Sequence, residues 1–386
     1  MTEKLYYRDS HLCEFCAEVR SCAESKGGWL VTLDRTAFFP EGGGQPADTG
    51  RIGEAHVLDV HEKDGEIFHR TDRPLTVGER CACVLDREKR LRRMQNHSGE
   101  HIVSGLVYRE HGFDNVGFHM GAECMTMDYS GELSWEELMR IERLANEAVR
   151  EDLPFKVWFP APEELGTLVY RSKLELTENV RIVEIPGVDR CACCAPHVSR
   201  SGEVGLVKIL SAERHRGGVR ITALCGMDAL DEACRRQESV MAISNLLSVK
   251  RDGVVSGVER LLEQLARQKE RIGLLGWEIA RLRAESTPPT EGCLALFDAV
   301  LDEAAQRELV NRLAEKSAVA AVFSGSEGEG WRYIIGSRRV NLREKTREIN
   351  AAIGGRGGGS PEMIQGRASA GETEISRFFK DWRPRE

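Results

Sequence analysis

The stretch VLDREKRLRRMQNHSGEHIVSGLVYREHG, residues 84–112, predicts a long helix that carries two histidines. Asp86 is a good N-cap, apolar residues recur at three- and four-residue intervals, and Gly112 offers a C-terminal stop. His97 and His101 would lie about one turn apart on the same face. Two imidazoles so placed can share a metal ion, although ordinary hydrogen bonds on a partly buried face would also explain the pair.

Composition limits the class of protein. The 386 residues are enough for two or three domains, each with its own core. Hydrophobic residues make up 41% and charged residues 30%, and no apolar run is long enough to cross a bilayer. The N-terminal MTEKLYYRDSHLCEF does not have the pattern of a signal peptide. The twelve cysteines therefore favour reduced thiols, metal ligands or packed cores over disulfides, and we expect a cytoplasmic protein.

The net charge of −8 argues against a protein that coats nucleic acid indiscriminately. Local basic clusters can still bind phosphates on an acidic protein. Two such clusters are Arg87, Lys89, Arg90, Arg92 and Arg93, and Arg214, His215, Arg216 and Arg220. Each also has the simpler explanation of a solvated face.

The order of apolar runs, turns and helical periodicity predicts an α+β chain in four parts. Residues 1–85 alternate short apolar runs with turn signals, which is the pattern of a small β-barrel or sandwich. Residues 86–228 suit helices on one side of an antiparallel sheet. Residues 229–288 have the leucine and isoleucine spacing of a helical hairpin or short coiled coil, which could carry a dimer contact. Residues 289–386 suggest a small α/β domain.

The stretch DRCACCAPHVSRSGEVGLVKI, residues 189–209, supplies partners for the two helix histidines. Cys193 and His197 stand four residues apart, with Cys191 and Cys194 beside them. A thiolate and an imidazole added to the helix pair would complete a tetrahedral Zn²⁺ site. A closed knuckle made of the three cysteines and His197, or a site with three ligands and an open fourth position, would also fit the spacing.

The HSGEH part of the helix also matches the inverted zinc-peptidase signature His-x-x-Glu-His. In that class of enzyme, Glu100 would activate a metal-bound water. The same class expects an acidic third ligand downstream, whereas the best downstream cluster here is cysteine and histidine. A zinc peptidase is therefore the second hypothesis, and a solvent-facing Glu100 is the simplest alternative to both.

Residues 36–50, TAFFPEGGGQPADTG, hold three consecutive glycines between two prolines. Such a backbone passes close to a neighbour that leaves no room for side chains, while Gln45 and Asp48 offer amide and carboxylate contacts. A plain hairpin connection would explain the glycines as well. The lysine and the Ser/Thr of a nucleotide P-loop are missing.

Three ordered motifs resemble one known family. PEGGGQ (40–45), NHSGEH (96–101) and CCAPHV (193–198) occur in the same order in the editing domain of alanyl-tRNA synthetase and in its freestanding relatives, the AlaX alanyl-tRNA editing proteins. The glycine-rich GGRGGGSPEMIQG (354–366) resembles the C-terminal DHH-associated domain of that synthetase. The chain is therefore similar to the long form of the editing protein.

This resemblance implies a trans-editing hydrolase that deacylates tRNA(Ala) mischarged with serine or glycine and spares Ala-tRNA(Ala). It implies a zinc ion held by His97, His101, Cys193 and His197, and a reaction that needs no ATP. The family's usual Cys-Gly-Gly-Thr-His is CCAPH here. The flexible glycines are lost, and Cys194 adjoins the expected ligand.

Selectivity makes a separate demand on such a site. Serine differs from alanine by one hydroxyl, which an apolar pocket discriminates poorly. A site that hydrogen-bonds the hydroxyl favours serine, because alanine would leave buried polar groups unpaired. The candidates for that contact are Thr36, Gln45, Thr126 and His119. With Glu100 as the proton acceptor, the catalytic candidates are Glu100, Thr36 and Gln45.

We expect the C-terminal part to contact tRNA phosphates. The basic residues proposed for these contacts are Arg338, Arg339, Arg343, Lys345, Arg347 and Arg356. The helical part before them could form a homodimer. Besides the zinc peptidase, the competing hypothesis is a tRNA-binding protein with structural zinc and no catalytic activity.

Overall fold

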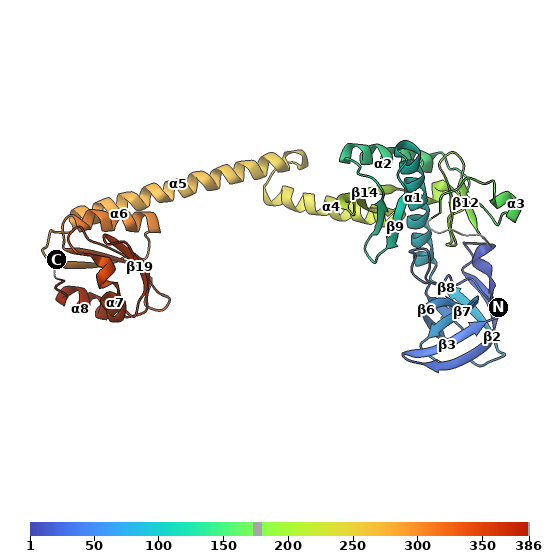
Figure 1. Ribbon diagram of the computed structural model, residues 1–386, viewed down its shortest axis with the longest axis horizontal. Coiled ribbons are helices and arrows are strands. Elements are labelled where there is room, and N and C mark those ends of the chain that lie inside the picture. Colours follow the sequence, from blue (N-terminus) through green and yellow to red (C-terminus); the bar gives the residue numbers. More distant parts are fainter. Residues whose placement is uncertain (173–179, 385–386) are drawn as a thin grey trace. The chain divides into compact units, whose positions relative to one another are not determined.

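The computed structural model describes residues 1–172 and 180–384, and the chain divides into two compact units (Figure 1). The first unit is Met1–Ser239 and the second is Val240–Glu386. The combination of helices with mostly antiparallel sheets confirms the predicted α+β class. Among the described residues, no helix is both long enough and apolar enough to span a membrane.

Six strands of the first unit close into a barrel in the order β2-β3-β7-β6-β5-β8. They are β2 (Glu14–Ser25), β3 (Gly28–Leu33), β5 (Gly50–Ile52), β6 (Ala55–Lys63), β7 (Glu66–Thr71) and β8 (Arg80–Leu85). Every second residue of β7 and β8 is buried, so that Ile67, Cys83 and Leu85 help to fill the interior. The parallel pair β1 (Glu3–Lys4) and β4 (Arg35–Thr36) and the 3-10 helix η1 (Leu5–Tyr7) complete this region.

The long helix α1 (Arg87–His111) follows the barrel directly. The Asp86 side chain accepts a hydrogen bond from the backbone amide of Lys89, and Gly112 ends the helix with a φ of 72°. Both boundaries agree with the sequence prediction. Together with α2 (Trp135–Arg150), α1 packs on one face of an antiparallel sheet of order β14-β15-β10-β9. The strands are β9 (Asn115–Met120), β10 (Met125–Tyr129), β14 (Val207–His215) and β15 (Gly218–Cys225).

A smaller antiparallel sheet precedes the segment that carries the cysteines. It has the order β11-β12-β13, with β11 (Lys156–Trp158), β12 (Ile182–Ile185) and β13 (Asp189–Ala192). The short helix α3 (Pro162–Leu165) follows β11 along the chain. Ser201–Val204 form the 3-10 helix η2, and the strand β14 begins after it at Val207.

Two helices cover the part predicted as a helical linker. They are α4 (Gly226–Leu246) and α5 (Val254–Ser286), with the 3-10 helix η3 (Arg251–Gly253) between them. The predicted seam on α5 is 48–65% exposed at Leu261, Leu262, Leu265, Ile272 and Leu275. Within the described part of the second unit these side chains stay exposed, and the helical hairpin stays a prediction. Dimerisation through α5 stays a prediction.

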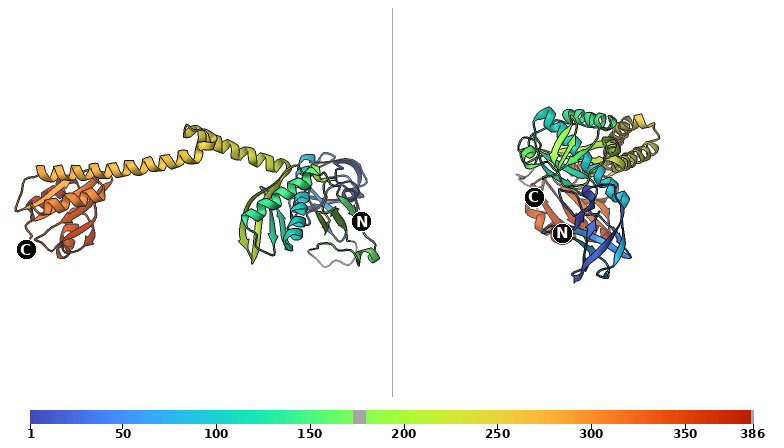
Figure 2. Two further views of the ribbon diagram at one scale, coloured as in Figure 1. Left: turned by 90° about the horizontal axis from the view of Figure 1, so that it is seen from above. Right: turned by 90° about the vertical axis from the view of Figure 1, so that its right-hand side faces the viewer.

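The second unit contains one sheet of order β16-β17-β18-β20-β19 between two layers of helices. Its strands are β16 (Cys293–Phe297), β17 (Val319–Ser326), β18 (Gly330–Gly336), β19 (Arg356–Gly359) and β20 (Met363–Ala368). The end of α5 and α6 (Glu303–Ala314) pack on one face, and α7 (Leu342–Ile353) and α8 (Glu372–Asp381) pack on the other (Figure 2). The pairing is parallel for β16 and β17 and antiparallel for the other strands.

Candidate metal centre

Four side chains from two segments converge in the first unit. His97 and His101 come from α1, and Cys193 and His197 come from the loop after β13. Each offers one ligand atom, and these atoms all lie within 4.8 Å of one another. Cys193 Sγ lies 3.6 Å from His97 Nε2 and 3.4 Å from His197 Nε2. The four residues predicted as ligands therefore form one group that could hold a metal ion, here called the four-ligand group.

Each imidazole of the four-ligand group has its Nδ1 atom held by a separate partner. The three pairs are His97 with Gln45 Oε1 at 2.9 Å, His101 with Asp189 Oδ2 at 3.0 Å, and His197 with Ser98 Oγ at 3.1 Å. An acceptor at Nδ1 keeps the proton on that nitrogen and leaves the lone pair on Nε2. All three rings are thus oriented to direct Nε2 toward the centre of the group.

Two members of the group, Cys193 and His197, have charge states that suit metal binding. Burial would raise the pKa of Cys193, but the nearby imidazoles of His97 and His197 hold the pKa of this thiol well below its usual value. Burial lowers the pKa of His197 to about 3, so this ring is neutral at pH 7. A thiolate and a neutral imidazole are the forms that coordinate metals.

Asp189 is the functional residue that the sequence prediction missed. Its carboxylate accepts a hydrogen bond from His101 and two from Arg171, at 2.8 Å from Nε and 2.9 Å from Nη2. Burial would raise the pKa of Asp189, but the hydrogen bonds from His101 and Arg171 hold it below the usual value. A carboxylate on the second nitrogen of a ligand imidazole fixes the ring. The sequence offered one indication of this role. Asp189 lies four residues before Cys193, and a histidine that binds metal through one nitrogen needs a hydrogen-bond acceptor for the other.

The glycine-rich turn brings a second partner to the group. Gly42 and Gln45 exchange two backbone hydrogen bonds of 3.1 and 3.0 Å, which closes a tight turn. Gly44 has a φ of 82°, and a Cβ atom there would lie 2.6 Å from the backbone oxygen of Phe118. Only glycine fits this position without strain. The turn can therefore pass close to β9 and place the Gln45 amide against His97.

A buried ion pair ties this turn to the first part of α1. Arg90 and Asp48 are both almost fully buried, and Arg90 Nε donates to Asp48 Oδ2 at 2.9 Å. The same guanidinium donates to the backbone oxygens of Ser10 and Ala37, while Asp48 accepts from the amide of Phe39. For Arg90, the prediction of a phosphate contact or a solvated face is therefore wrong. Its charge is used to hold the turn on the helix that carries the ligand histidines.

Glu100 lies beside the four-ligand group and is buried. Its Oε1 accepts hydrogen bonds from Ser104 Oγ at 2.8 Å and from Asn115 Nδ2 at 2.7 Å. Its Oε2 lies 3.7 Å from His101 Nε2. One carboxylate oxygen is therefore fixed by neighbouring side chains, and the other is next to the candidate metal position.

Of the four residues predicted to contact the serine hydroxyl, Gln45 alone hydrogen-bonds to the four-ligand group among the described residues. Gln45 touches the group through His97, and its Nε2 is a buried donor without a partner among the described residues. Thr36 Oγ1 lies 2.9 Å from His69 Nε2 in the barrel region. Thr126 and His119 lie directly opposite each other on β10 and β9. For residues 1–172 and 180–384, no hydrogen bond joins these last three candidates to the four ligands, and their roles stay predictions.

Two further cysteines lie near the group without joining it. Cys191 is buried, with its thiol pKa raised to about 11 by burial, and it forms a second cluster with His101 and Asp189. Cys194 Sγ lies next to the glycine-rich turn, 3.8 Å from where a Cβ atom on Gly43 would be. Within the described residues, the closed knuckle of three cysteines that the spacing had left open is not formed.

Comparison with known proteins gives the family context. Residues 180–222 match the model of the threonyl and alanyl tRNA synthetase second additional domain, and residues 291–382 match the DHHA1 domain. The alanyl-tRNA editing protein AlaX-L of Pyrococcus horikoshii is 29% identical over 97% of this chain and 96% of that protein. The chain is a homologue of AlaX-L. This finding confirms the resemblance inferred from the three motifs.

Alanine–tRNA ligases are also similar to this AlaX-L homologue. Those of Methanopyrus kandleri and Halorubrum lacusprofundi are each 32% identical over 95% of this chain and 42% of the ligase. The chain therefore spans about two fifths of the length of the ligases it matches. The first matched domain includes Cys193 and His197, which are half of the four-ligand group.

Proposed function

We propose that this AlaX-L homologue is an aminoacyl-tRNA deacylase that hydrolyses Ser-tRNA(Ala) and spares Ala-tRNA(Ala). The observation that carries the proposal is the four-ligand group beside the buried Glu100, in a chain that matches an editing protein over almost its full length. Water adds to the ester, and free amino acid and tRNA leave. We place the reaction in the cytoplasm, with tRNA(Ala) as the partner.

Zinc is the metal that we propose for the four-ligand group. Imidazole nitrogens and a thiolate are the ligands that Zn²⁺ takes in tetrahedral sites. Zinc bonds of about 2.0–2.3 Å to such ligands imply a nitrogen-to-sulfur separation of roughly 3.5 Å. The separations of 3.4 and 3.6 Å between Cys193 Sγ and two of the imidazoles support that fit. A bound zinc ion would cross-link α1 to the loop after β13 and hold the site in shape around Glu100.

Glu100 is the proton acceptor in this proposal. An aminoacyl ester is already activated, so that a positioned water and a shaped site supply most of what catalysis needs. Ser104 and Asn115 hold Oε1, which leaves Oε2 to take a proton from the attacking water. Glu100 then returns the proton to the ribose oxygen as the ester bond breaks. The carboxylate is thereby restored for the next substrate.

We assign the selection of serine to Gln45 rather than to Thr36. A serine hydroxyl that accepts from Gln45 Nε2 would satisfy a buried donor that alanine leaves unpaired, at a cost of roughly 1–3 kcal/mol. The Thr36 hydroxyl is already engaged with His69. Glycine lacks the hydroxyl as well, so this contact makes serine the preferred substrate and Gly-tRNA(Ala) the weaker one.

The experiment that tests the proposal measures amino-acid release from purified Ser-tRNA(Ala), Gly-tRNA(Ala) and Ala-tRNA(Ala) with and without a zinc chelator. We expect serine to be released fastest, a loss of release with chelator, and recovery after Zn²⁺ is restored. No release from any substrate with zinc in place would overturn the deacylase and favour a tRNA-binding protein with structural zinc. Cleavage of a peptide panel that depends on Glu100 would favour the peptidase, although four protein ligands leave no open tetrahedral position for its water.

A further inference from the structure

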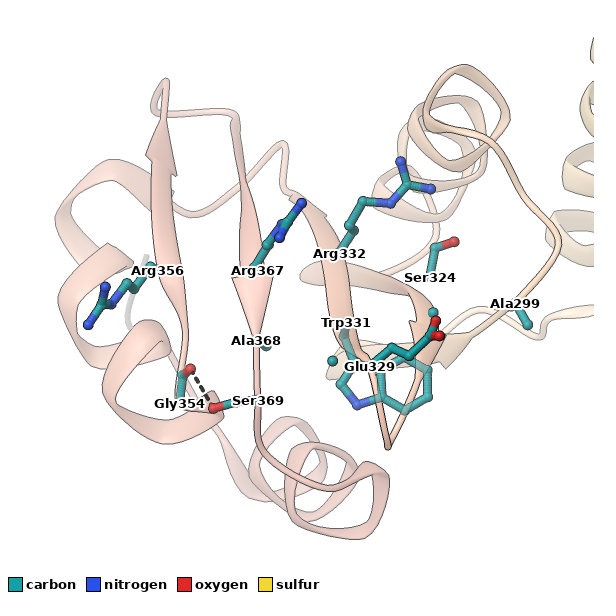
Figure 3. Close-up of a pocket in the computed structure, with 12 residues that line it drawn as sticks. Ala299, Ser324, Glu329, Trp331, Arg332, Gly354, Arg356, Arg367, Ala368 and Ser369 are labelled. Carbon is teal, nitrogen blue, oxygen red and sulfur yellow. Dashed lines mark hydrogen bonds between the residues drawn. The ribbon is translucent and has the colours of Figure 1, made fainter. Parts of the chain in front are cut away.

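Three arginines stand in register across three neighbouring strands of the C-terminal sheet. Arg332 on β18 lies directly opposite Arg367 on β20, and Arg367 lies directly opposite Arg356 on β19. Residues that are paired in this way project from the same face of a sheet. The three side chains therefore form one row, here called the arginine row, and Figure 3 shows them on three adjacent strands.

The arginine row places three like charges side by side. Like charges directly opposite each other destabilise an antiparallel sheet. Within the described part of the chain, no ion pair or side-chain hydrogen bond engages any of the three guanidinium groups. By contrast, Arg220 on β15 lies opposite Asp128 on β10 and binds it through two hydrogen bonds. The protein has a net charge of −8, so the three unpaired arginines form a positive cluster on an acidic protein.

The arginine row lines a hollow surface. A cavity of about 590 Å³ is bounded by all three arginines together with Ser324, Trp331 and Glu329, which is the one acidic residue of its lining (Figure 3). Arg332 and Arg367 also border a second hollow of about 240 Å³, with Gln365 and Glu303. The concave region around the row therefore extends past the cavity and carries a positive surplus.

We infer that the arginine row binds the phosphodiester backbone of tRNA, an inference that rests on tRNA as the partner in the proposed function. The guanidinium fork matches phosphate oxygens in pairs. Neighbouring strands are about 4.8 Å apart, so the row distributes its three charges along a line. That distribution suits successive phosphates of a chain better than the single phosphate of a small ligand. Of the basic residues predicted for this contact, the arginine row retains Arg356, and it adds Arg332 of β18 and Arg367 of β20.

The test measures the affinity of the full-length protein for tRNA(Ala) at several salt concentrations. The variant Arg332→Gln/Arg356→Gln/Arg367→Gln removes the row. Each lost phosphate contact lowers the slope of log affinity against log salt by about 0.7–0.9, so the slope should fall by roughly 2–3. Affinity at 0.1 M salt should fall at least about tenfold.

A triple variant at and just after α8 controls for total charge. Arg377→Gln/Lys380→Gln/Arg383→Gln removes three exposed charges from the same domain and should leave the slope within about 0.5 of the parent. An equal loss in both variants, or no loss in the row variant, overturns the inference. Competition by inorganic phosphate beyond that of chloride at equal ionic strength would also overturn it, because it would indicate a site for one free phosphate.

A second readout separates this inference from the deacylase proposal. Serine release by the row variant should keep its kcat while KM rises, and far-UV circular dichroism should show an unchanged fold. His101→Ala should lose serine release and keep its tRNA affinity. If no variant or parent releases serine but affinity still depends on the row, the deacylase fails and the tRNA contact stands. A row variant that loses kcat with unchanged affinity would reject the contact.

Discussion

Arginine is used in opposite ways in the two units of this protein. Around the four-ligand group, the buried Arg90 and the partly buried Arg171 pair with Asp48 and Asp189, and each of these pairs holds a segment that positions a ligand. In the C-terminal sheet, the three guanidinium groups of the arginine row are exposed and have no partner among the described residues. The first arrangement positions the side chains of the four-ligand group, and the second leaves positive charge available to a ligand.

The difference follows from the cost of burying a charge. A buried charge without a partner costs several kcal/mol, so an arginine in the core must be tied to a carboxylate or to carbonyl groups. An exposed arginine keeps its hydration and bears only the repulsion of its neighbours. We therefore expect substitutions in the first unit to damage metal binding or stability, and substitutions in the arginine row to damage binding alone.

The largest effect should come from the four-ligand group itself. Removal of the partner of a ligand imidazole lowers metal affinity or activity by about 10–100-fold, and His101→Ala, which removes a ligand, should cost more than that. Zinc content per chain should fall from about one to near zero, and serine release should be lost with it. His56→Ala, at an exposed histidine of the barrel, is the matched control and should change neither quantity. Full zinc content in His101→Ala would reject the proposed shell.

The next effect tests the buried pair behind the glycine-rich turn. Arg90→Met leaves the buried Asp48 carboxylate with Arg93, at 3.6 Å, as its remaining charged partner, which should lower the free energy of unfolding by about 3 kcal/mol. Urea unfolding followed by circular dichroism measures the change. Arg51→Met, from the exposed pair with Glu54, should change stability by less than about 1 kcal/mol. Equal shifts in the two variants would mean that burial does not set the role of Arg90.

Local patterns in the sequence were sufficient to predict α1 and the residues of the four-ligand group. The Asp86 cap, the Gly112 stop and the four-residue spacing of His97 and His101 all lie within one segment, and helix geometry links them without knowledge of the fold. The Cys193 loop was found because its residue types have few other common uses in this pattern. The structure then brought these two segments together.

The supporting residues could not be predicted because their partners are distant in the sequence. Arg90 and Asp48 are 42 residues apart, and His101 and Asp189 are 88 residues apart. The arginine row depends on strand register, which the sequence leaves open until β18, β19 and β20 are paired. The apolar seam of α5 predicted the helix, but the partner of the seam stays a prediction, because a hydrophobic pattern does not say which surface will cover it.

A smaller effect on zinc affinity should follow from a change at Asp189, which contacts His101 but is not one of the four ligands. Asp189→Asn removes the charge that pairs with Arg171 and weakens the acceptor of His101, so zinc affinity should fall by about 10–100-fold while the fold is retained. Competition with a chromophoric chelator measures the affinity. Asp152→Asn, at a half-exposed carboxylate paired with Arg200, should leave zinc affinity unchanged. An unchanged affinity in Asp189→Asn would mean that the imidazole does not need this carboxylate for its orientation.

The smallest predicted effect is a change in stability at the arginine row, and its direction shows whether the row supports the sheet. Arg367→Gln removes the middle charge of the arginine row and relieves repulsion from both sides, so stability should stay the same or rise by at most about 1 kcal/mol. Arg220→Gln makes the same change on an antiparallel strand, but it removes the partner of Asp128 and should lower stability. Thermal unfolding of the two variants side by side compares them directly. A loss of stability in Arg367→Gln would show that the row supports the sheet, and its arginines would then no longer be free for a phosphate backbone.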